Sequence, residues 1–62
     1  MNIDVMRKEF REILEHEKRA KNFYEHYISQ LEDPQIKEEL TAIRDDEIVH
    51  IKLVEQLIDY VK

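Results

Sequence analysis

Apolar residues recur along two long segments of the chain, at alternating spacings of three and four residues. In the first segment this seam runs through Ile3, Met6, Phe10, Ile13, Glu17, Ala20, Tyr24, Tyr27 and Leu31. In the second segment it runs through Ile36, Leu40, Ile43, Glu47, His50, Val54, Leu57 and Val61. A seam of this period lies on one face of an α-helix and is typical of helices that pack at shallow left-handed crossing angles. The pattern therefore predicts an all-α protein with helices at about 3–31 and 34–61.

The dipeptide Asp33-Pro34 separates the two predicted helices. Asp is a favoured N-cap, and Pro is favoured at the first helical position, where its missing N–H leaves no hydrogen bond unmade. We therefore expect a turn at 32–33, with Asp33 as the cap of the second helix and Asn2 or Asp4 as the cap of the first. Two long helices joined by so short a connection run antiparallel. The whole chain is thus expected to form a single helical-hairpin domain.

The apolar surface is broader than a two-helix contact requires. Further apolar residues widen both seams, namely Leu14, Ile28, Ile51, Leu53, Ile58 and Tyr60. A single partner helix cannot cover so wide a stripe, and a broad uncovered apolar patch usually marks an interface. We infer self-association, most simply of two hairpins that close into a four-helix bundle about a two-fold axis.

Three members of the seam are polar: Glu17, Glu47 and His50. Burying an ionised carboxylate without a partner costs several kcal/mol, so these residues need an explanation. If the chain turns near residue 32, Glu17 lies opposite Glu47, roughly 22 Å from the turn at 1.5 Å per residue. His50 lies on the same helix face as Glu47, because residues three apart are neighbours on a helix. The three side chains are therefore expected to converge at one level.

A two-fold axis through that level would bring together four Glu and two His. This set matches the di-iron carboxylate site of ferritin-like bundles, in which two helices supply one Glu each and the other two supply Glu-x-x-His. Such ligands suit Fe(II), Mn(II) or, less selectively, Zn(II), and two divalent ions would neutralise the four carboxylates. The alternative is that Glu-x-x-His is a solvated helix face, or that the polar layer fixes register without any metal.

Composition narrows the possible functions. Ten Lys and Arg against fifteen Asp and Glu give a net charge of −5, which disfavours a general nucleic-acid or anionic-membrane binder. The absence of Cys excludes disulfides and thiolate metal sites, and the absence of Gly excludes phosphate-binding Gly-rich loops. No apolar run approaches the ~20 residues of a membrane-spanning helix, and the N-terminal sequence lacks the plan of a signal peptide. We therefore expect a cytoplasmic protein.

Several of these residues together carry a family resemblance. They are Glu17, the pair Phe23-Tyr24, the turn Asp33-Pro34 and the run Arg44-Asp45-Asp46-Glu47-Ile48-Val49-His50. From about residue 13 to residue 61 the chain resembles the encapsulated ferritin-like family and, more loosely, one half of a rubrerythrin-type or ferritin bundle. In that family, two-helix subunits dimerise to build a di-iron ferroxidase centre. The positions that match its metal ligands are Glu17, Glu47 and His50, and Tyr24 matches the tyrosine beside its site.

The resemblance also implies partners and a location. Dimers of that family associate into rings and deliver oxidised iron to the lumen of an encapsulin shell. The resemblance thus implies a homodimer, a ring-like higher oligomer and iron storage within an encapsulin nanocompartment. Two features depart from the family: the acidic residues where iron enters correspond to His16 and Arg19, and the shell-targeting C-terminal extension has no counterpart up to Lys62.

The main hypothesis is a ferroxidase that oxidises Fe(II) at a di-iron site between two subunits, with Mn or Zn as possible substitutes for iron. Tyr24 is interpreted either as a core aromatic residue or, in a functional role, as the donor of a hydrogen bond from its hydroxyl to a ligand carboxylate. His16 and His26 are interpreted as solvated, and Asp45 and Asp46 as an acidic helix surface. One alternative is a rubrerythrin-like di-iron protein that reduces peroxide, which would need a separate electron donor because the chain has no Cys. The other is a non-enzymatic helical assembly module.

Overall fold

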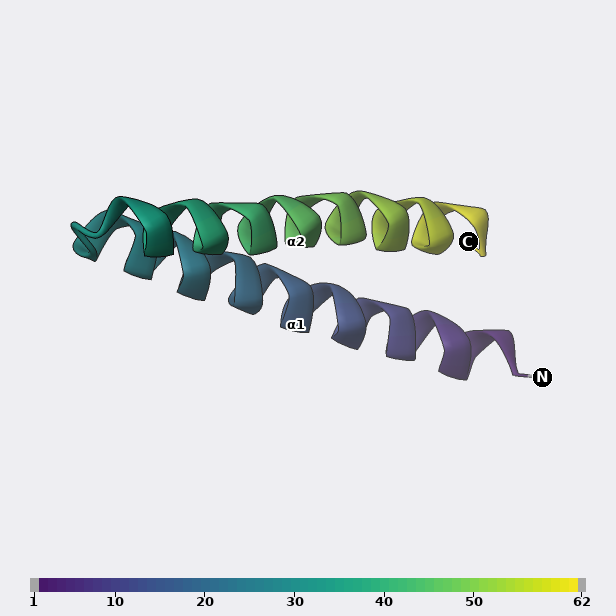
Figure 1. Ribbon diagram of the computed structural model, residues 1–62. Coiled ribbons are helices and arrows are strands. Elements are labelled where there is room, and N and C mark those ends of the chain that lie inside the picture. The colour runs from purple at the N-terminus through teal and green to yellow at the C-terminus, as the bar shows by residue number, and fades with distance from the viewer. Residues whose placement is uncertain (1, 62) are drawn as a thin grey trace.

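The computed structural model describes residues 2–61, which form two antiparallel α-helices (Figure 1). Helix α1 comprises Ile3–Gln30 and helix α2 comprises Pro34–Tyr60. The hairpin measures 47 × 14 × 14 Å, and both chain ends lie at the end opposite the loop. The expected all-α fold with two helices is confirmed. Within the described residues, neither helix is long and apolar enough to cross a membrane.

Both helices begin at a side-chain cap. Asn2 Oδ1 accepts hydrogen bonds from two backbone N–H groups of the first turn of α1, at 2.9 and 3.3 Å. Asp33 Oδ1 accepts equivalent bonds from Gln35 N at 2.9 Å and Ile36 N at 3.2 Å, and Pro34 occupies the first turn of α2. These bonds satisfy N–H groups that have no partner inside the helix. The local sequence therefore sets where α2 starts and how short the loop is.

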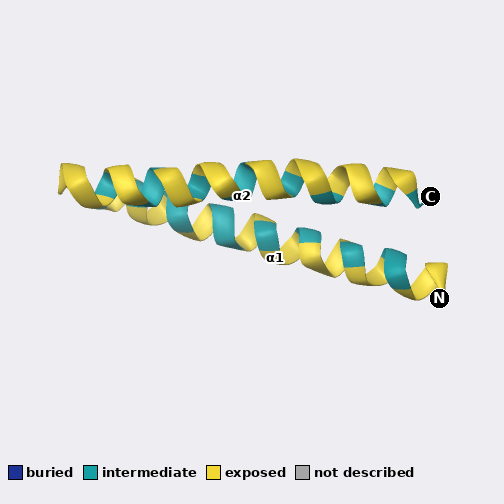
Figure 2. Ribbon diagram, turned by 45° about the vertical axis from the view of Figure 1, so that its right-hand side comes forward, coloured by how far each residue is buried: buried dark blue, intermediate teal, exposed yellow. Residues whose placement is uncertain are grey.

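The two helices contact each other through a half-buried stripe on each facing side (Figure 2). On α1 the apolar residues of this stripe are Met6, Phe10, Leu14, Ala20, Tyr24 and Ile28. On α2 they are Leu40, Ile48, Ile51, Val54 and Ile58. None of residues 2–61 with a burial assignment is fully buried. The hairpin alone therefore encloses no core, as expected for a chain whose apolar surface exceeds one helix–helix contact.

Polar contacts join the two helices at two further places. The Arg7 guanidinium donates a hydrogen bond through Nε to the Val61 carbonyl at the C-terminal end of α2. Nearer the loop, Arg44 Nη1 lies 3.7 Å from Glu25 Oε1, which also lies 3.4 Å from Lys21 Nζ. Although the helices diverge toward the chain ends in Figures 1 and 2, the Arg7 bond connects them there.

Candidate metal centre

Glu17, Glu47 and His50 converge from the two helices at one level of the hairpin. Each offers one ligand atom, and the three atoms lie within 4.8 Å of one another. Nδ1 of His50 lies 3.7 Å from Oε2 of Glu17. Both glutamates are half-buried, whereas the His50 side chain is 55% exposed. The residues predicted to meet therefore do meet within a single chain, with the imidazole on the outer side.

This convergence follows from the local sequence. The three-residue separation of Glu47 and His50 puts both on neighbouring positions of α2, about one turn apart. The cap at Asp33 fixes the start of α2 and with it the level at which Glu47 lies beside α1. Glu17 lies at that same level on α1. A different loop length would shift the two glutamates past each other by about 1.5 Å per residue.

Two carboxylate oxygens of this cluster lack hydrogen-bond partners. Within residues 2–61, Glu17 Oε2 and Glu47 Oε2 are buried and receive no hydrogen bond. A buried acceptor left in this state costs about 1–3 kcal/mol, and more when it is charged. Two such atoms side by side require either a proton between them or a cation. The two oxygens therefore need a proton or a cation that the ionised side chains themselves do not supply.

Proton sharing explains the electrostatics of the cluster. Contact with the carboxyl of Glu17 raises the pKa of Glu47 above its ordinary value, because a proton on one group bridges both. Burial and the negative charges of Glu17 and Asp46 raise this pKa further, while His50 opposes the rise. Without a metal, Glu47 therefore holds its proton more tightly than an isolated glutamate does.

The donor set fits a divalent metal of the first transition series. Carboxylate oxygen and imidazole nitrogen together suit Fe(II), Mn(II) and Zn(II). Bonds of about 2.0–2.2 Å to a central ion put opposite ligands roughly 4 Å apart, so the observed spread of 4.8 Å closes with small side-chain rotations. One chain supplies three protein ligands and would leave further coordination positions open.

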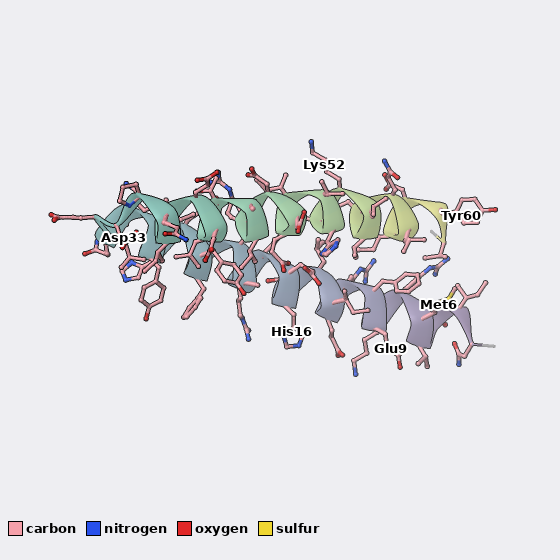
Figure 3. The ribbon with its side chains drawn as sticks, viewed as in Figure 1. Met6, Glu9, His16, Asp33, Lys52 and Tyr60 are labelled. Atoms are coloured by element: carbon pink, nitrogen blue, oxygen red, sulfur yellow. The ribbon has the colours of Figure 1, made fainter. Side chains whose placement is uncertain are left out.

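The remaining predicted residues lie around the cluster in different ways. Tyr24 is half-buried and packs edge-on against Phe23, with ring centroids 5.8 Å apart. In the described part of the chain its hydroxyl forms no hydrogen bond with either glutamate, so that role stays a prediction. His16 is exposed and points away from α2 (Figure 3). His26 is also exposed, with its ring 5.4 Å from that of Tyr27.

The two aspartates that precede Glu47 make different interactions. The sequence pattern alone indicated one acidic helix surface and did not separate them. Asp45 Oδ1 accepts a hydrogen bond of 2.9 Å from Nε of Arg44. Asp46 is exposed, and its charge contributes to the raised pKa of Glu47. Residues one position apart point about 100° apart around a helix, and this offset in the sequence could have distinguished the two aspartates.

A comparison with protein-family models, curated proteins and solved structures finds no match for this chain. The resemblance to encapsulated ferritin-like proteins therefore rests on the residues quoted above.

Proposed function

We propose that two copies of this chain form a four-helix bundle that binds two iron ions and oxidises Fe(II). The observation that carries the proposal is the pair of buried, unpartnered oxygens of Glu17 and Glu47 beside the His50 imidazole. Cations supply what those oxygens lack, and two ions would neutralise the four carboxylates of a dimer.

A second copy is needed because a single chain offers an incomplete site. Its three ligands would hold one ion with several positions open, and His50 lies more than half exposed. Two copies that meet at this level supply four carboxylates and two imidazoles, the set used by di-iron carboxylate bundles. Exposed apolar residues around His50, among them Ile43 and Leu57, provide the surface for that association.

Within the proposed site, Glu17 and Glu47 bind the ions and His50 completes each ligand set. Bound iron supplies the redox chemistry: two Fe(II) ions yield two electrons to O₂, which leaves as hydrogen peroxide with two protons from solvent, or to peroxide, which gives water. The protein's part is to hold both ions together, to keep Glu47 ionised once cations are bound, and to leave positions open for the oxidant.

One other function has a specific observation in its favour. Large apolar side chains stay exposed along both helices, and they would drive assembly whether or not a metal binds. A helical assembly module with a polar register layer would use the same surface. It differs from the ferroxidase in that its association and stability would not depend on Fe(II).

Stopped-flow oxidation of iron tests the proposal. Protein loaded anaerobically with Fe(II) and then exposed to air is expected to form Fe(III) faster than buffer does. Glu47→Ala should reduce that rate to the buffer rate, because the ion loses a carboxylate from each chain. Glu55→Ala, an exposed glutamate on the same helix, is the matched control and should keep the rate. Equal oxidation by wild type and Glu47→Ala would refute the ferroxidase. Turnover of peroxide with an added reductant, without net iron storage, would indicate the peroxide-reducing alternative.

A further inference from the structure

A network of ion pairs joins the two helices on the loop side of the candidate metal centre. Oε1 of Glu25 lies 3.4 Å from Nζ of Lys21 on the same helix and 3.7 Å from Nη1 of Arg44 on α2. Arg44 also donates a hydrogen bond of 2.9 Å through Nε to Oδ1 of Asp45. We call Lys21, Glu25 and Arg44 the clamp. In it, one carboxylate lies between a cation of each helix.

The clamp lies about one helical turn from both glutamates of the metal centre. Lys21 follows Glu17 by four residues, and Arg44 precedes Glu47 by three. Residues that are three or four apart are neighbours on the same face of a helix. The clamp therefore connects α1 to α2 at the turn next to the one that carries the carboxylate ligands.

The side chains of the clamp are partly withdrawn from water. Those of Lys21, Glu25 and Arg44 are 27–40% exposed. A single ion pair on an open surface contributes little to stability, but a network of several charges with restricted side chains contributes more. The hydrogen bond to Asp45 further restricts the guanidinium of Arg44. The clamp is therefore suited to holding the two helices at a fixed spacing.

The separation of Glu17 and Glu47 depends on such a connection. The helices diverge toward the chain ends (Figure 1), and none of residues 2–61 with a burial assignment is fully buried, so no enclosed core holds the helices together. Two ionised carboxylates at one level repel each other and favour wider spacing. A connection one turn away limits how far this repulsion can move the helices apart.

The ion pair also resists sliding of one helix along the other. Counted along the sequence from residue 32, Arg44 lies farther from the loop than Glu25 does. The contact between them therefore runs obliquely across the two helices. If α2 slid away from the loop, the distance between the two charged groups would increase and their attraction would weaken.

The effect of the clamp on the metal centre is one of geometry. The charges that shift the pKa of Glu47 are those of Glu17, His50 and Asp46, and the two cations of the clamp are not among them. No clamp residue belongs to the group of three candidate ligands either. Any influence of the clamp on the ligands is therefore transmitted through the positions of the helices.

We propose that Glu25 and Arg44 are positioning residues for the metal centre, and that their ion pair holds Glu17 and Glu47 at the separation that a bound ion spans. Lys21 supports the pair by fixing the carboxylate of Glu25. This inference deepens the proposed function and rests on it for the identity of the ligand, a divalent metal. Neither positioning residue touches the ion.

Binding of Mn(II) tests the proposal at the metal centre. Glu25→Gln keeps the size of the side chain and removes its charge, and Arg44→Gln removes the opposite charge. Each is expected to weaken Mn(II) binding about two- to fivefold, the range that a partly exposed ion pair can supply. The double variant should be little weaker than either single one, because both changes break the same contact. The electron paramagnetic resonance spectrum of the bound ion, which reports its ligand geometry, should broaden in all three.

The matched control separates positioning from stability alone. Asn2→Ala removes the two cap hydrogen bonds of α1 and should lower the melting temperature. Asn2 lies fifteen residues from Glu17, so this variant should keep the Mn(II) affinity of the wild type. A loss of affinity in Asn2→Ala as large as in the clamp variants would overturn the proposal, because the clamp would then act only through stability.

A second measurement needs no metal. The chain has no native Cys, so spin labels can be attached through Glu15→Cys and Val49→Cys, two exposed positions at equal distance along the sequence from residue 32. Labelled protein is diluted with unlabelled protein in chelator, and double electron–electron resonance measures the distance between the helices at the level of the ligands. Glu25→Gln is expected to broaden this distance distribution, whereas Asn2→Ala should leave it unchanged.

The proposal stands only if the clamp variants change both the Mn(II) affinity and the spin-label distances. If either stays as in the wild type, Glu25 and Arg44 do not position the metal ligands. Circular dichroism of each variant excludes misfolding as the cause of a change. If the wild type binds no divalent metal, the proposed function fails, and the spin-label distances of the metal-free chain still decide whether the clamp sets the separation of the glutamates. If the clamp variants behave as the wild type while Fe(II) oxidation persists, only the clamp fails.

Discussion

Glu17 and Glu47 bring their carboxyl groups together from opposite helices, and within residues 2–61 the Oε2 atom of each is buried without a hydrogen-bond partner. Polar atoms in this state destabilise a folded chain unless a proton or a cation joins them. The arrangement therefore lowers the stability of the metal-free protein, and under the proposed function bound cations would restore it.

The metal-free protein is expected to be more stable as Glu47→Gln than as wild type at neutral pH. The pKa of Glu47 is raised in the folded chain, so the stability gained from its shared proton is present at acid pH and is lost as pH rises through that pKa. Gln keeps a donor toward Glu17 at every pH, a hydrogen bond worth about 0.5–1.5 kcal/mol. Urea unfolding in the presence of chelator measures the difference, which should vanish below the ordinary pKa of Glu. Glu55→Gln is the exposed control, and an equal gain there would count against the explanation.

Divalent metal is expected to raise the melting temperature of the wild type. A ligand that binds only the folded state at a hundred times its Kd stabilises by roughly 2.7 kcal/mol, about 10 °C or more for so small a domain. Anaerobic melting with Fe(II), or with Mn(II) as a redox-stable probe, measures the shift. Glu17→Ala and His50→Ala should abolish it, whereas His16→Ala should leave it unchanged. A melting temperature that neither metal nor chelator changes would favour the assembly module.

A charge on the exposed apolar surface around His50, which includes Ile43 and Leu57, is expected to separate the two copies of the proposed dimer. Ile43→Asp puts a carboxylate on this surface, so light scattering should report half the wild-type mass and metal binding should weaken. Val49→Asp changes another exposed apolar residue of α2, which lies outside this surface, and it should keep the wild-type mass. Dissociation by Val49→Asp but not by Ile43→Asp would place the interface on another side of α2.

Loss of the cap of α2 is expected to weaken the whole hairpin. Asp33→Ala removes two hydrogen bonds to backbone N–H groups, and such caps contribute about 1 kcal/mol. Because this cap also fixes the level of Glu47, affinity for metal should fall along with stability. The neighbouring exposed residue serves as control: Glu32→Ala should change neither quantity by more than a few tenths of a kcal/mol.

Local rules predicted the helices because their signals need no tertiary information. Asp33-Pro34 predicts where α2 starts, and an unbroken run of helix-forming residues predicts the extent of α1. The choice between Asn2 and Asp4 as the first cap stayed open, since both are good caps, and the structure selects Asn2. The meeting of Glu17, Glu47 and His50 followed from helix period and loop position together.

Periodicity did not predict which half of each broad stripe faces the partner helix. Leu14 and Ile28, which widen the first seam, lie in the contact between the helices. Ile13 and Tyr27, members of that seam, lie largely outside it. Residues one position apart differ by about 100° around a helix, and an apolar stripe of that width fits either orientation. Packing of the two helices against each other settles the orientation and leaves Ile13 and Tyr27 largely exposed.

Metal content and solution mass, measured on one sample purified without chelator, show whether two copies of the chain form an iron-binding bundle. We expect a dimer, or a multiple of it, that carries one iron ion per chain and loses the iron when Glu47 is replaced by Ala. A monomer, or a dimer that binds no divalent metal even after anaerobic loading with Fe(II), would contradict it.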